Sequence, residues 1–328
     1  MDKAGMIVVT GGGGFIGAHM VRTFQEQGFD RVRAVDVKPL DEWYQITDGV
    51  ENLRLDLRDK AACFEAAAGA QYIFNLAADM GGIGFIEGNK ALCMLSSLIS
   101  THVLMAAHEY DVERVFYSSS ACVYAADKQT SADSTALRES DAYPAMPEDG
   151  YGWEKLFAER MARHFSEDFG LATRVARYHN VYGPYGTYDG GREKAPAAIC
   201  RKVVNAKLSG NHHIDIWGDG EQTRSFMYID DCLQGSQMIM DSDIVEPLNL
   251  GSDELVTVNQ LVDIVEDIAG VTLERSYQLD APQGVRGRNS DNTLIKERLG
   301  WAPSIPLRVG LEHTYRWIHD ELTAGVPA

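Results

Sequence analysis

A glycine-rich turn near the start of the chain restricts its fold more than any other feature. The turn, residues 10–17, follows an apolar run at residues 6–9 and opens a segment whose apolar residues recur at helical spacing. A strand, a glycine turn and an amphipathic helix in this order form the first unit of a parallel sheet that binds a dinucleotide. We therefore expect a phosphate-binding turn between the first strand and the first helix.

The positions of the glycines fit the contacts that such a turn must make. Gly11 permits the tight turn, Gly14 lets backbone N–H groups approach a pyrophosphate, and Gly17 permits close packing of the helix on the strand. Phe15 and Ile16 lie at the same helix start and are expected beside the cofactor.

A carboxylate follows the second predicted strand. Asp36 comes 19 residues after Gly17, where it can accept hydrogen bonds from the ribose 2′-hydroxyl of adenosine and would repel a 2′-phosphate. This favours NAD over NADP, and nearby basic residues weaken the argument without reversing it. Asp56, after the strand-like residues 53–55, either lies beside the adenine or is an ordinary carboxylate at a strand end.

Apolar strand-like runs alternate with helical patterns along the first half of the chain. The runs are at residues 6–9, 32–35, 53–55, 72–75, 114–117 and 173–177, and the helical patterns are near 15–27, 60–68, 90–109 and 151–168. This alternation is typical of a Rossmann-type, doubly wound parallel sheet in an α/β fold. We expect an NAD-binding domain at residues 1–183 and about 225–252, with a strand returning at 247–250. A smaller mixed C-terminal lobe, about 184–224 and 253–320, is expected to bind the substrate.

A serine, a tyrosine and a lysine predict redox chemistry. Tyr151 and Lys155 are four residues apart, so on a helix they share one face, where the ammonium group can lower the pKa of the phenol. Ser120, at the end of a predicted strand, would contact the same substrate oxygen. Such a triad takes a proton from a hydroxyl during hydride transfer. Tyr-x-x-x-Lys alone also arises by chance in amphipathic helices, but the glycine turn favours the catalytic interpretation.

Further motifs extend this pattern along the chain. Residues 10–17, 75–78, 118–124, 151–155 and 178–184 together resemble the extended short-chain dehydrogenase/reductase family. Within that family, residues 77–82, 120–122, 190–198, 217–220 and 284–291 are similar to epimerases that act on GDP-mannose. The resemblance covers about residues 5–317. It implies tightly bound NAD and inversion of sugar C3 and C5, giving GDP-L-galactose and, by C5 inversion alone, GDP-L-gulose.

Cys122 distinguishes the predicted site from that of simpler relatives. A lone cysteine is usually a small buried hydrophobe, but strand alternation would point Cys122 and Ser120 to the same side. A ketone at C4 acidifies the hydrogens on C3 and C5, and inversion then needs a base on one face and an acid on the other. Cys122 can be the base if a nearby cation favours its thiolate. The resemblance assigns the opposite acid to Lys194, which by sequence alone would be a solvated lysine.

The resemblance also implies a set of substrate contacts. They are Gly82, Ser120, Ala121, Cys122, Asn180, Glu193, Lys194, Ala195, Lys202, Gln222, Thr223, Arg224, Arg286 and Arg288. Arg286 and Arg288 are expected to bind the diphosphate, which suits guanidinium geometry, although both could be surface residues of a polar loop. The long irregular segment at residues 125–149 is expected to lie over the cleft.

Charge and composition limit the partners. The net charge of −18 argues against nucleic acid and anionic membrane surfaces. We expect no signal peptide and no window approaching the roughly 20 apolar residues of a membrane span, which favours the cytoplasm. The five cysteines have neither metal-ligand nor Cys-x-x-Cys spacing, as expected of reduced thiols. The resemblance suggests a homodimer formed through helices near residues 90–109 and 151–168.

Other functions stay open from the sequence. A UDP-sugar 4-epimerase or UDP-glucuronate decarboxylase would share the fold and the triad but would give Cys122 and Lys194 no paired role. An NADP-linked reductase would consume its cofactor, and an NAD-sensing binding protein would not need the intact triad. The product ratio is also open, because inversion at C5 alone and at both carbons uses the same residues.

Overall fold

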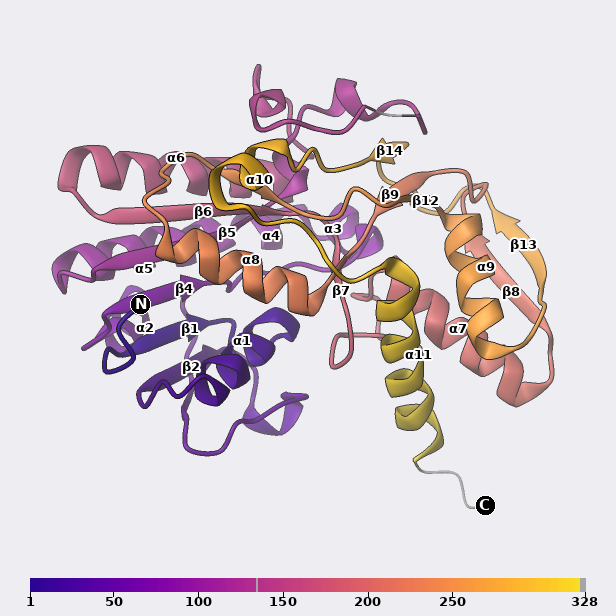
Figure 1. The fold of residues 1–328 in the computed structure, drawn as a ribbon, viewed down its shortest axis with the longest axis horizontal. Coiled ribbons are helices and arrows are strands. Elements are labelled where there is room, and N and C mark those ends of the chain that lie inside the picture. The colour runs from indigo at the N-terminus through magenta and orange to yellow at the C-terminus, as the bar shows by residue number, and fades with distance from the viewer. Residues whose placement is uncertain (134, 325–328) are drawn as a thin grey trace.

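The computed structural model of the chain describes residues 1–133 and 135–324 (Figure 1). Its centre is a seven-stranded sheet whose neighbouring strands are all parallel. Across the sheet the strands are β11 (Leu248–Leu250), β6 (Ala172–Tyr178), β5 (Arg114–Ser120), β4 (Tyr72–Asn75), β1 (Ile7–Thr10), β2 (Val32–Asp36) and β3 (Glu51–Arg54). The chain reverses direction across the sheet between β1 and β4, where such folds bind ligands. The predicted doubly wound sheet is confirmed.

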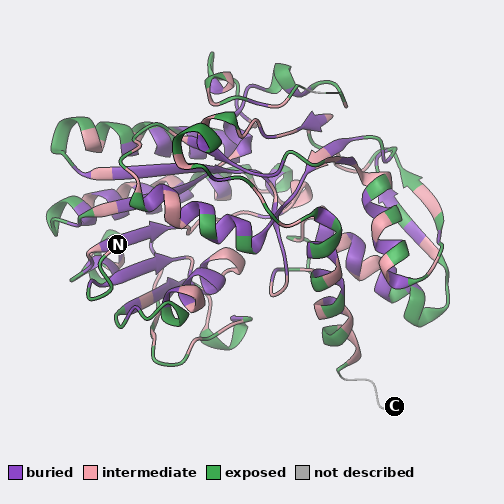
Figure 2. Ribbon diagram, viewed as in Figure 1, coloured by how far each residue is buried: buried purple, intermediate pink, exposed green. Residues whose placement is uncertain are grey.

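Helices cover both faces of this sheet. They are α2 (Lys60–Ala67), α5 (Ser96–Glu109) and α6 (Tyr151–Phe169) on one face, and α1 (Phe15–Glu26) and α8 (Ile229–Asp241) on the other. Strand alternation divides the core accordingly: Val8 and Ile73 face the first layer, and Ile7, Val9 and Phe74 face the second. Burial on both faces is why β1 and β4 are almost continuously apolar (Figure 2).

A smaller lobe lies beyond the carboxyl ends of the strands (Figure 1). It contains α7 (Ala195–Ser209), α9 (Val258–Ala269), α11 (Leu307–Thr323), the sheet β12 (Leu255–Thr257)–β9 (Thr223–Ser225)–β14 (Gly287–Arg288), and the pair β13 (Glu274–Gln278)–β8 (His213–Trp217). Local sequence sets the ends of α9: Thr257 and Gln260 form a reciprocal capping box, and Gly270 ends the helix at φ 66°. The lobe shares one apolar core with the face of the sheet that α1 covers.

Shorter elements surround the site. They are α3 (Ile83–Gly88), α4 (Lys90–Met94), α10 (Thr293–Leu299), the pair β7 (Val181–Tyr182)–β10 (Met227–Tyr228), and the 3-10 helices η1 (Leu40–Glu42), η2 (Ala121–Val123), η3 (Ala126–Gln129) and η4 (Glu139–Ala142). The predicted helix at 90–109 is divided between α4 and α5. The alternation argument for Cys122 was wrong, because β5 ends at Ser120, whose Oγ accepts the N–H of Cys122 at 3.2 Å and starts η2.

One segment departs from the expectation about membrane spans. Residues 90–109 are long and apolar enough to cross a membrane, with mean hydropathy 1.4. However, 44% of that window is buried, and α5 packs between α2 and α6 against the sheet. Its apolar residues therefore lie partly in the core, against α2, α6 and the sheet, and partly on the surface. The cytoplasmic location stays a prediction.

Candidate active site

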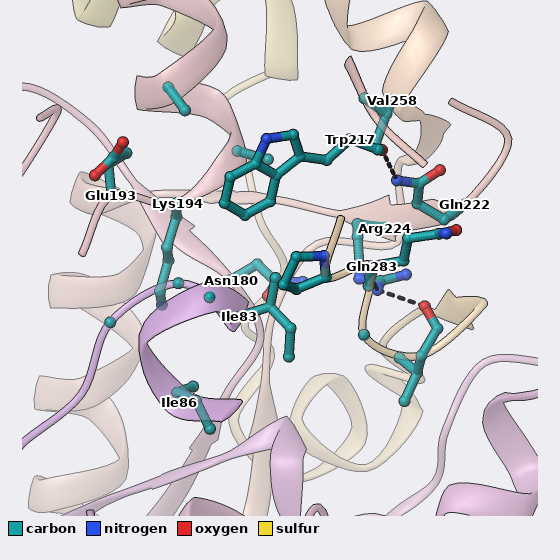
Figure 3. A pocket seen from close by; sticks show the side chains of 18 of the residues that line it. Ile83, Ile86, Asn180, Glu193, Lys194, Trp217, Gln222, Arg224, Val258 and Gln283 are labelled. Carbon is teal, nitrogen blue, oxygen red and sulfur yellow. Dashed lines mark hydrogen bonds between the residues drawn. The ribbon is translucent and has the colours of Figure 1, made fainter. Parts of the chain in front are cut away.

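A cavity of about 330 Å³ lies between the carboxyl ends of the large sheet and the smaller lobe. Its walls come from α3, the end of β5, the starts of α6 and α7, and strands β8 and β9. Figure 3 shows Asn180, Lys194, Trp217 and Arg224, from four segments, around this space. Its volume and its mixture of apolar walls with converging polar groups are those of a small-molecule site.

The glycine turn between β1 and α1 has the geometry of a dinucleotide site. Gly11 has φ +72°, and a Cβ at Gly17 would lie 2.1 Å from the carbonyl oxygen of Gly11, so neither position tolerates a side chain. Gly14 is the N-cap of α1, and no side chain caps that helix. The first N–H groups of α1, at Phe15 and Ile16, are therefore available to a pyrophosphate.

Asp36 ends β2 next to this turn, as predicted. Its Oδ2 accepts the N–H of Gly13 at 3.1 Å, and its Oδ1 accepts the N–H of Lys38 at the same distance. These contacts fix the carboxylate at the edge of the turn, where it suits a ribose hydroxyl. Asp56 instead pairs with Arg58 at 2.6 Å, which lowers the pKa of the carboxyl, so its role beside the adenine stays a prediction.

The predicted triad converges at the cavity. Ser120 ends β5 and Tyr151 begins α6, and both line the cavity. Lys155 follows one helical turn later and is only 2% exposed. Its Nζ donates to the carbonyl of Ser118 at 3.0 Å and lies 5.5 Å from the centre of the Tyr151 ring. The lysine thus holds the helix start against the end of β5.

The predicted effect of Lys155 on the phenol is not found. Burial raises the pKa of Tyr151 well above its usual value, negative charge on Cys122 and Glu154 raises it further, and hydrogen bonding with Ser120 opposes the rise. The buried carboxylate of Glu154 lies 3.8 Å from Lys155 Nζ and offsets its charge. A neutral phenol is therefore the resting form of Tyr151.

Cys122 lines the cavity and has the neighbouring cation that the sequence hypothesis required. That cation is Arg288, whose Nη1 donates to Cys122 Sγ at 3.4 Å. Burial and Glu148 raise the pKa of the Cys122 thiol, while Arg288 opposes the rise. Burial alone would lower the pKa of Arg288, but Cys122 and Glu148 hold it above its usual value. The thiol therefore rests protonated beside a guanidinium that can stabilise its thiolate.

Lys194 reaches the same cavity from the opposite lobe. It is the N-cap residue of α7, and Figure 3 shows its side chain extending toward α3. Burial lowers the pKa of the Lys194 ammonium, an effect that Arg288 adds to and Cys122 opposes. A lowered pKa makes this ammonium a stronger acid than a surface lysine. Cys122 and Lys194 therefore present a thiol and an ammonium to one space from two lobes.

Most of the predicted substrate contacts line the cavity. These are Gly82, Ser120, Cys122, Ala121, Asn180, Glu193, Lys194, Ala195, Lys202, Gln222, Arg224 and Arg288. A Cβ at Gly82 would lie 2.3 Å from the carbonyl oxygen of Glu193, so the backbones of these two residues are in close contact in the cavity wall. Burial and Arg288 lower the pKa of Arg224 to about 9, and no carboxylate in the described part of the chain forms an ion pair with it. Arg224 is therefore suited to a diphosphate.

Two predicted contacts lie outside this cavity. Thr223 lies between Gln222 and Arg224, so alternation turns its side chain away, and its Oγ1 donates to the carbonyl of Ala132 at 2.6 Å. Arg286 pairs with Asp219 at 2.8 Å on an exposed surface. The shared diphosphate role predicted for Arg286 and Arg288 is therefore not what the structure indicates. The two side chains diverge, and only Arg288 reaches the cavity.

Sequence reasoning missed Glu148 and Gln129, which complete the surroundings of Arg288. Gln129 Oε1 accepts from Arg288 Nε at 2.6 Å, and Glu148 Oε2 lies 3.3 Å from Arg288 Nη2. Both belong to the irregular segment that was expected over the cleft. Glu148 precedes the triad tyrosine by three residues, and this proximity was the one signal available.

Residues 7–251 match the NAD dependent epimerase/dehydratase family. Over 317 residues, the chain is 45% identical to GDP-mannose 3,5-epimerase 1 of Oryza sativa subsp. japonica, covering 96% of this chain and 82% of the rice protein. It is 44% identical to GDP-mannose 3,5-epimerase of Arabidopsis thaliana with the same coverage.

Solved structures share the fold over the whole chain. UDP-glucose 4-epimerase of Thermotoga maritima with UDP-glucose superposes with a TM-score of 0.86 at 26% identity, covering 96% of this chain and 99% of that one. MoeE5 in complex with UDP-glucuronic acid and NAD gives a TM-score of 0.81 at 27% identity, covering 97% of this chain and all of that one.

Proposed function

Because the chain belongs to the NAD-dependent epimerase/dehydratase family, we propose that it converts GDP-mannose to GDP-L-galactose by inverting C3 and C5. Inversion at C5 alone gives GDP-L-gulose as a second product. The observation that most supports this activity is the meeting of Cys122 and Lys194 in one cavity with Ser120 and Tyr151. A simple 4-epimerase needs only the last two.

NAD is the cofactor, and the residues present fit it. The N–H groups at the start of α1 would hold its pyrophosphate, and Asp36 its adenosine ribose. When bound, NAD supplies the reversible two-electron oxidation of C4 of the sugar. The reaction therefore ends with the cofactor in the state in which it began.

Tyr151 moves the proton of the C4 hydroxyl. Its phenol begins α6 beside Ser120, so both oxygens can contact the substrate oxygen. Ser120 Oγ is already oriented by the N–H of Cys122 at 3.2 Å. Lys155 positions the phenol by tying the start of α6 to the Ser118 carbonyl. We assign proton transfer to Tyr151 and positioning to Ser120 and Lys155.

Cys122 and Lys194 perform the inversions. With a ketone at C4, the hydrogens of C3 and C5 become acidic, because the carbanions that remain delocalise as enolates. The Cys122 thiolate, stabilised by Arg288, removes the hydrogen from one face, and the Lys194 ammonium donates a proton to the other. The raised pKa of the thiol makes its thiolate a strong base, and the lowered pKa of the ammonium makes it a ready donor.

The lobe side of the cavity supplies contacts for the nucleotide. Lys202, Gln222 and Arg224 line it, and the lysine and the arginine are local cations in a chain of net charge −18. Lys202 Nζ lies 6.0 Å from the centre of the Trp217 ring and donates to the Asp215 carbonyl at 2.7 Å. We assign the diphosphate to Arg224, which has no competing carboxylate partner among the described residues.

We also propose that the protein is a homodimer formed through α4, α5 and α6. Those helices pack together and leave large apolar side chains exposed. They are Met94, Leu95, Leu98, Trp153 and Phe157, between 39% and 49% exposed. Clustered exposed apolar side chains are typical of an association surface. Sedimentation that finds a monomer at micromolar concentration would remove this proposal.

Proton NMR in D2O tests the activity directly. GDP-mannose incubated with the protein should acquire deuterium at C3 and C5 while signals of GDP-L-galactose appear. Exchange at C5 alone would indicate an enzyme that forms GDP-L-gulose only. Absence of exchange at both carbons would reject the Cys122 and Lys194 mechanism on this substrate, and parallel incubation with UDP-glucose would then test 4-epimerisation.

A further inference from the structure

Glu148 is a carboxylate of the cavity that the mechanism above does not use. Its backbone N–H donates to the carbonyl of Cys122 at 3.0 Å, which fixes the two residues side by side. Its Oε2 contacts Arg288 at 3.3 Å. Its Oε1 is buried and has no hydrogen-bond partner among the described residues. One carboxylate oxygen is thus held, and the other is open to a proton.

Arg288 holds Glu148 and Cys122 with two arms of one guanidinium. Nη1 contacts the sulfur at 3.4 Å, and Nη2 contacts the carboxylate. The other charged or titratable groups that act on the thiol are Arg224, Tyr151 and Lys194. With both acids ionised, two negative charges would compete for the guanidinium between them. A proton on either acid removes this competition and leaves the guanidinium to the other.

The proposed 3,5-epimerisation needs a group that accepts a proton from Cys122, and the inference rests on that function. In the chair form of a mannopyranose, the hydrogens on C3 and C5 are both axial and lie on the same face of the ring. One base must therefore remove both, and it must lose the first proton before it can take the second. Cys122 needs a partner that accepts this proton.

We propose that Glu148 is the proton acceptor of Cys122: it takes up the proton of the thiol, and their shared Arg288 holds the two acids side by side. Arg288 stays a cation throughout, and its two arms stabilise whichever of the two acids is ionised. Gln129 holds the third nitrogen of the guanidinium at 2.6 Å and so fixes its orientation.

Each transfer balances without any change of oxidation state. First the S–H bond of Cys122 breaks and an O–H bond forms on Glu148. The thiolate then takes hydrogen from carbon as a proton, and the C–H electron pair stays on the sugar as an enolate. Glu148, whose side chain is 20% exposed, passes its proton to water and can accept the next one. Lys194 donates to the opposite face and regains its proton from water.

The rate of alkylation of Cys122 measures this coupling without any turnover of substrate. Iodoacetamide alkylates the thiolate of a cysteine, so its rate at Cys122, followed by peptide mass spectrometry across pH, gives the apparent pKa of the thiol. The other four cysteines are at most 1% exposed and provide an internal reference for slow reaction. The purified protein as it is isolated is compared with Glu148→Gln and Asp149→Asn.

Glu148→Gln should move the alkylation profile to lower pH by about one unit or more, because it removes the negative charge that competes for Arg288. Asp149→Asn is the matched control: its carboxylate is exposed and pairs with Lys90 at 2.7 Å, so the profile should not move. If Glu148→Gln folds poorly, Glu148→Asp, which draws the charge back by one methylene, should give a smaller shift in the same direction.

Two results would overturn the inference. One is an unchanged profile in Glu148→Gln, and the other is an equal shift in the Asp149→Asn control, which would mean a general charge effect. The NMR exchange experiment on the unaltered protein is independent of both. A shifted profile with no exchange at C3 or C5 would reject the proposed function and leave the coupling of Glu148 to Cys122 established.

Discussion

Two buried arginines of this molecule have opposite surroundings. Arg177, on β6, donates from Nε and Nη2 to the two oxygens of Glu159 at 2.9 and 2.7 Å, and from Nη1 to the carbonyl of Glu139 at 2.7 Å. Arg288, on β14, contacts a thiol at 3.4 Å and a carboxylate at 3.3 Å. Both arginines are less than a tenth exposed.

The difference lies in what each arginine leaves unsatisfied. Glu159 has both oxygens occupied by Arg177 and also accepts from Ser119, so neither oxygen is left without a partner. Glu148 keeps one buried oxygen without a partner, and Cys122 faces open space. A fully satisfied buried pair fixes a structure, whereas a partly satisfied one retains groups that can exchange protons. Four substitutions test this contrast.

The largest effect is expected at the thiol. Cys122→Ala removes the proposed base and should lower the rate of deuterium exchange at C5 by about 10²–10⁴-fold. The free energy of unfolding in urea should change by only about 1 kcal/mol, typical of an ordinary point substitution. Cys63→Ala is the control, because Cys63 lies on α2 with its thiol donating to the Leu57 carbonyl. Exchange within tenfold of the unaltered protein would contradict the role of Cys122.

The next largest effect is expected on the free energy of unfolding, at Arg177. Glu159→Gln leaves the buried Arg177 without its counter-charge and should lower the free energy of unfolding by about 3–5 kcal/mol. The rate of exchange per folded molecule should stay the same. Urea titration measures the first quantity and NMR the second. Glu167→Gln, on the same helix, breaks an exposed pair with Arg163 and should have a much smaller effect. Equal losses in the two variants would refute the contrast.

The fold was largely predictable because its signals are local. Gly11 and Gly17 occupy positions where a Cβ is strained or blocked, and continuous apolar runs such as residues 7–10 match strands buried on both faces. The same local logic failed at Cys122, because the Ser120 hydroxyl captured a backbone N–H and ended the strand before Cys122. A side-chain cap of this kind overrides strand alternation.

The site was only partly predictable, because its decisive contacts are distant in sequence. Arg288 contacts Cys122 across 166 residues and Glu148 across 140. Nothing in the spacing of Arg286 and Arg288 indicates that one binds an exposed aspartate and the other a thiol. The pairing of Lys194 with Cys122 likewise needed the resemblance to known epimerases, since a lysine at the start of a loop-to-helix junction has no catalytic signature of its own.

A smaller effect is expected when a lysine replaces Arg288, because the positive charge stays but the forked guanidinium is lost. Arg288→Lys cannot contact Cys122, Glu148 and Gln129 together, so we expect kcat to fall by about 10- to 100-fold. The lysine keeps the charge but loses the Nη1 hydrogen bond to the sulfur, so alkylation of Cys122 should move to higher pH, opposite to the shift in Glu148→Gln. A normal kcat with a raised KM would instead mean that Arg288 only binds substrate.

The smallest effect is expected two residues away, at Arg286. This residue immediately precedes β14, and its side chain pairs on the surface with Asp219, whose pKa it lowers by hydrogen bonding. Exposed pairs of this kind contribute little, so Arg286→Ala should leave kcat, KM and the urea midpoint within about twofold or less of their original values. A large rise in KM for GDP-mannose would restore the diphosphate role that the sequence predicted for Arg286. Residues 286 and 288 share charge, chemistry and neighbourhood in the sequence, so an unchanged KM would show that their partners, Asp219 for Arg286 and Cys122 for Arg288, give them different roles.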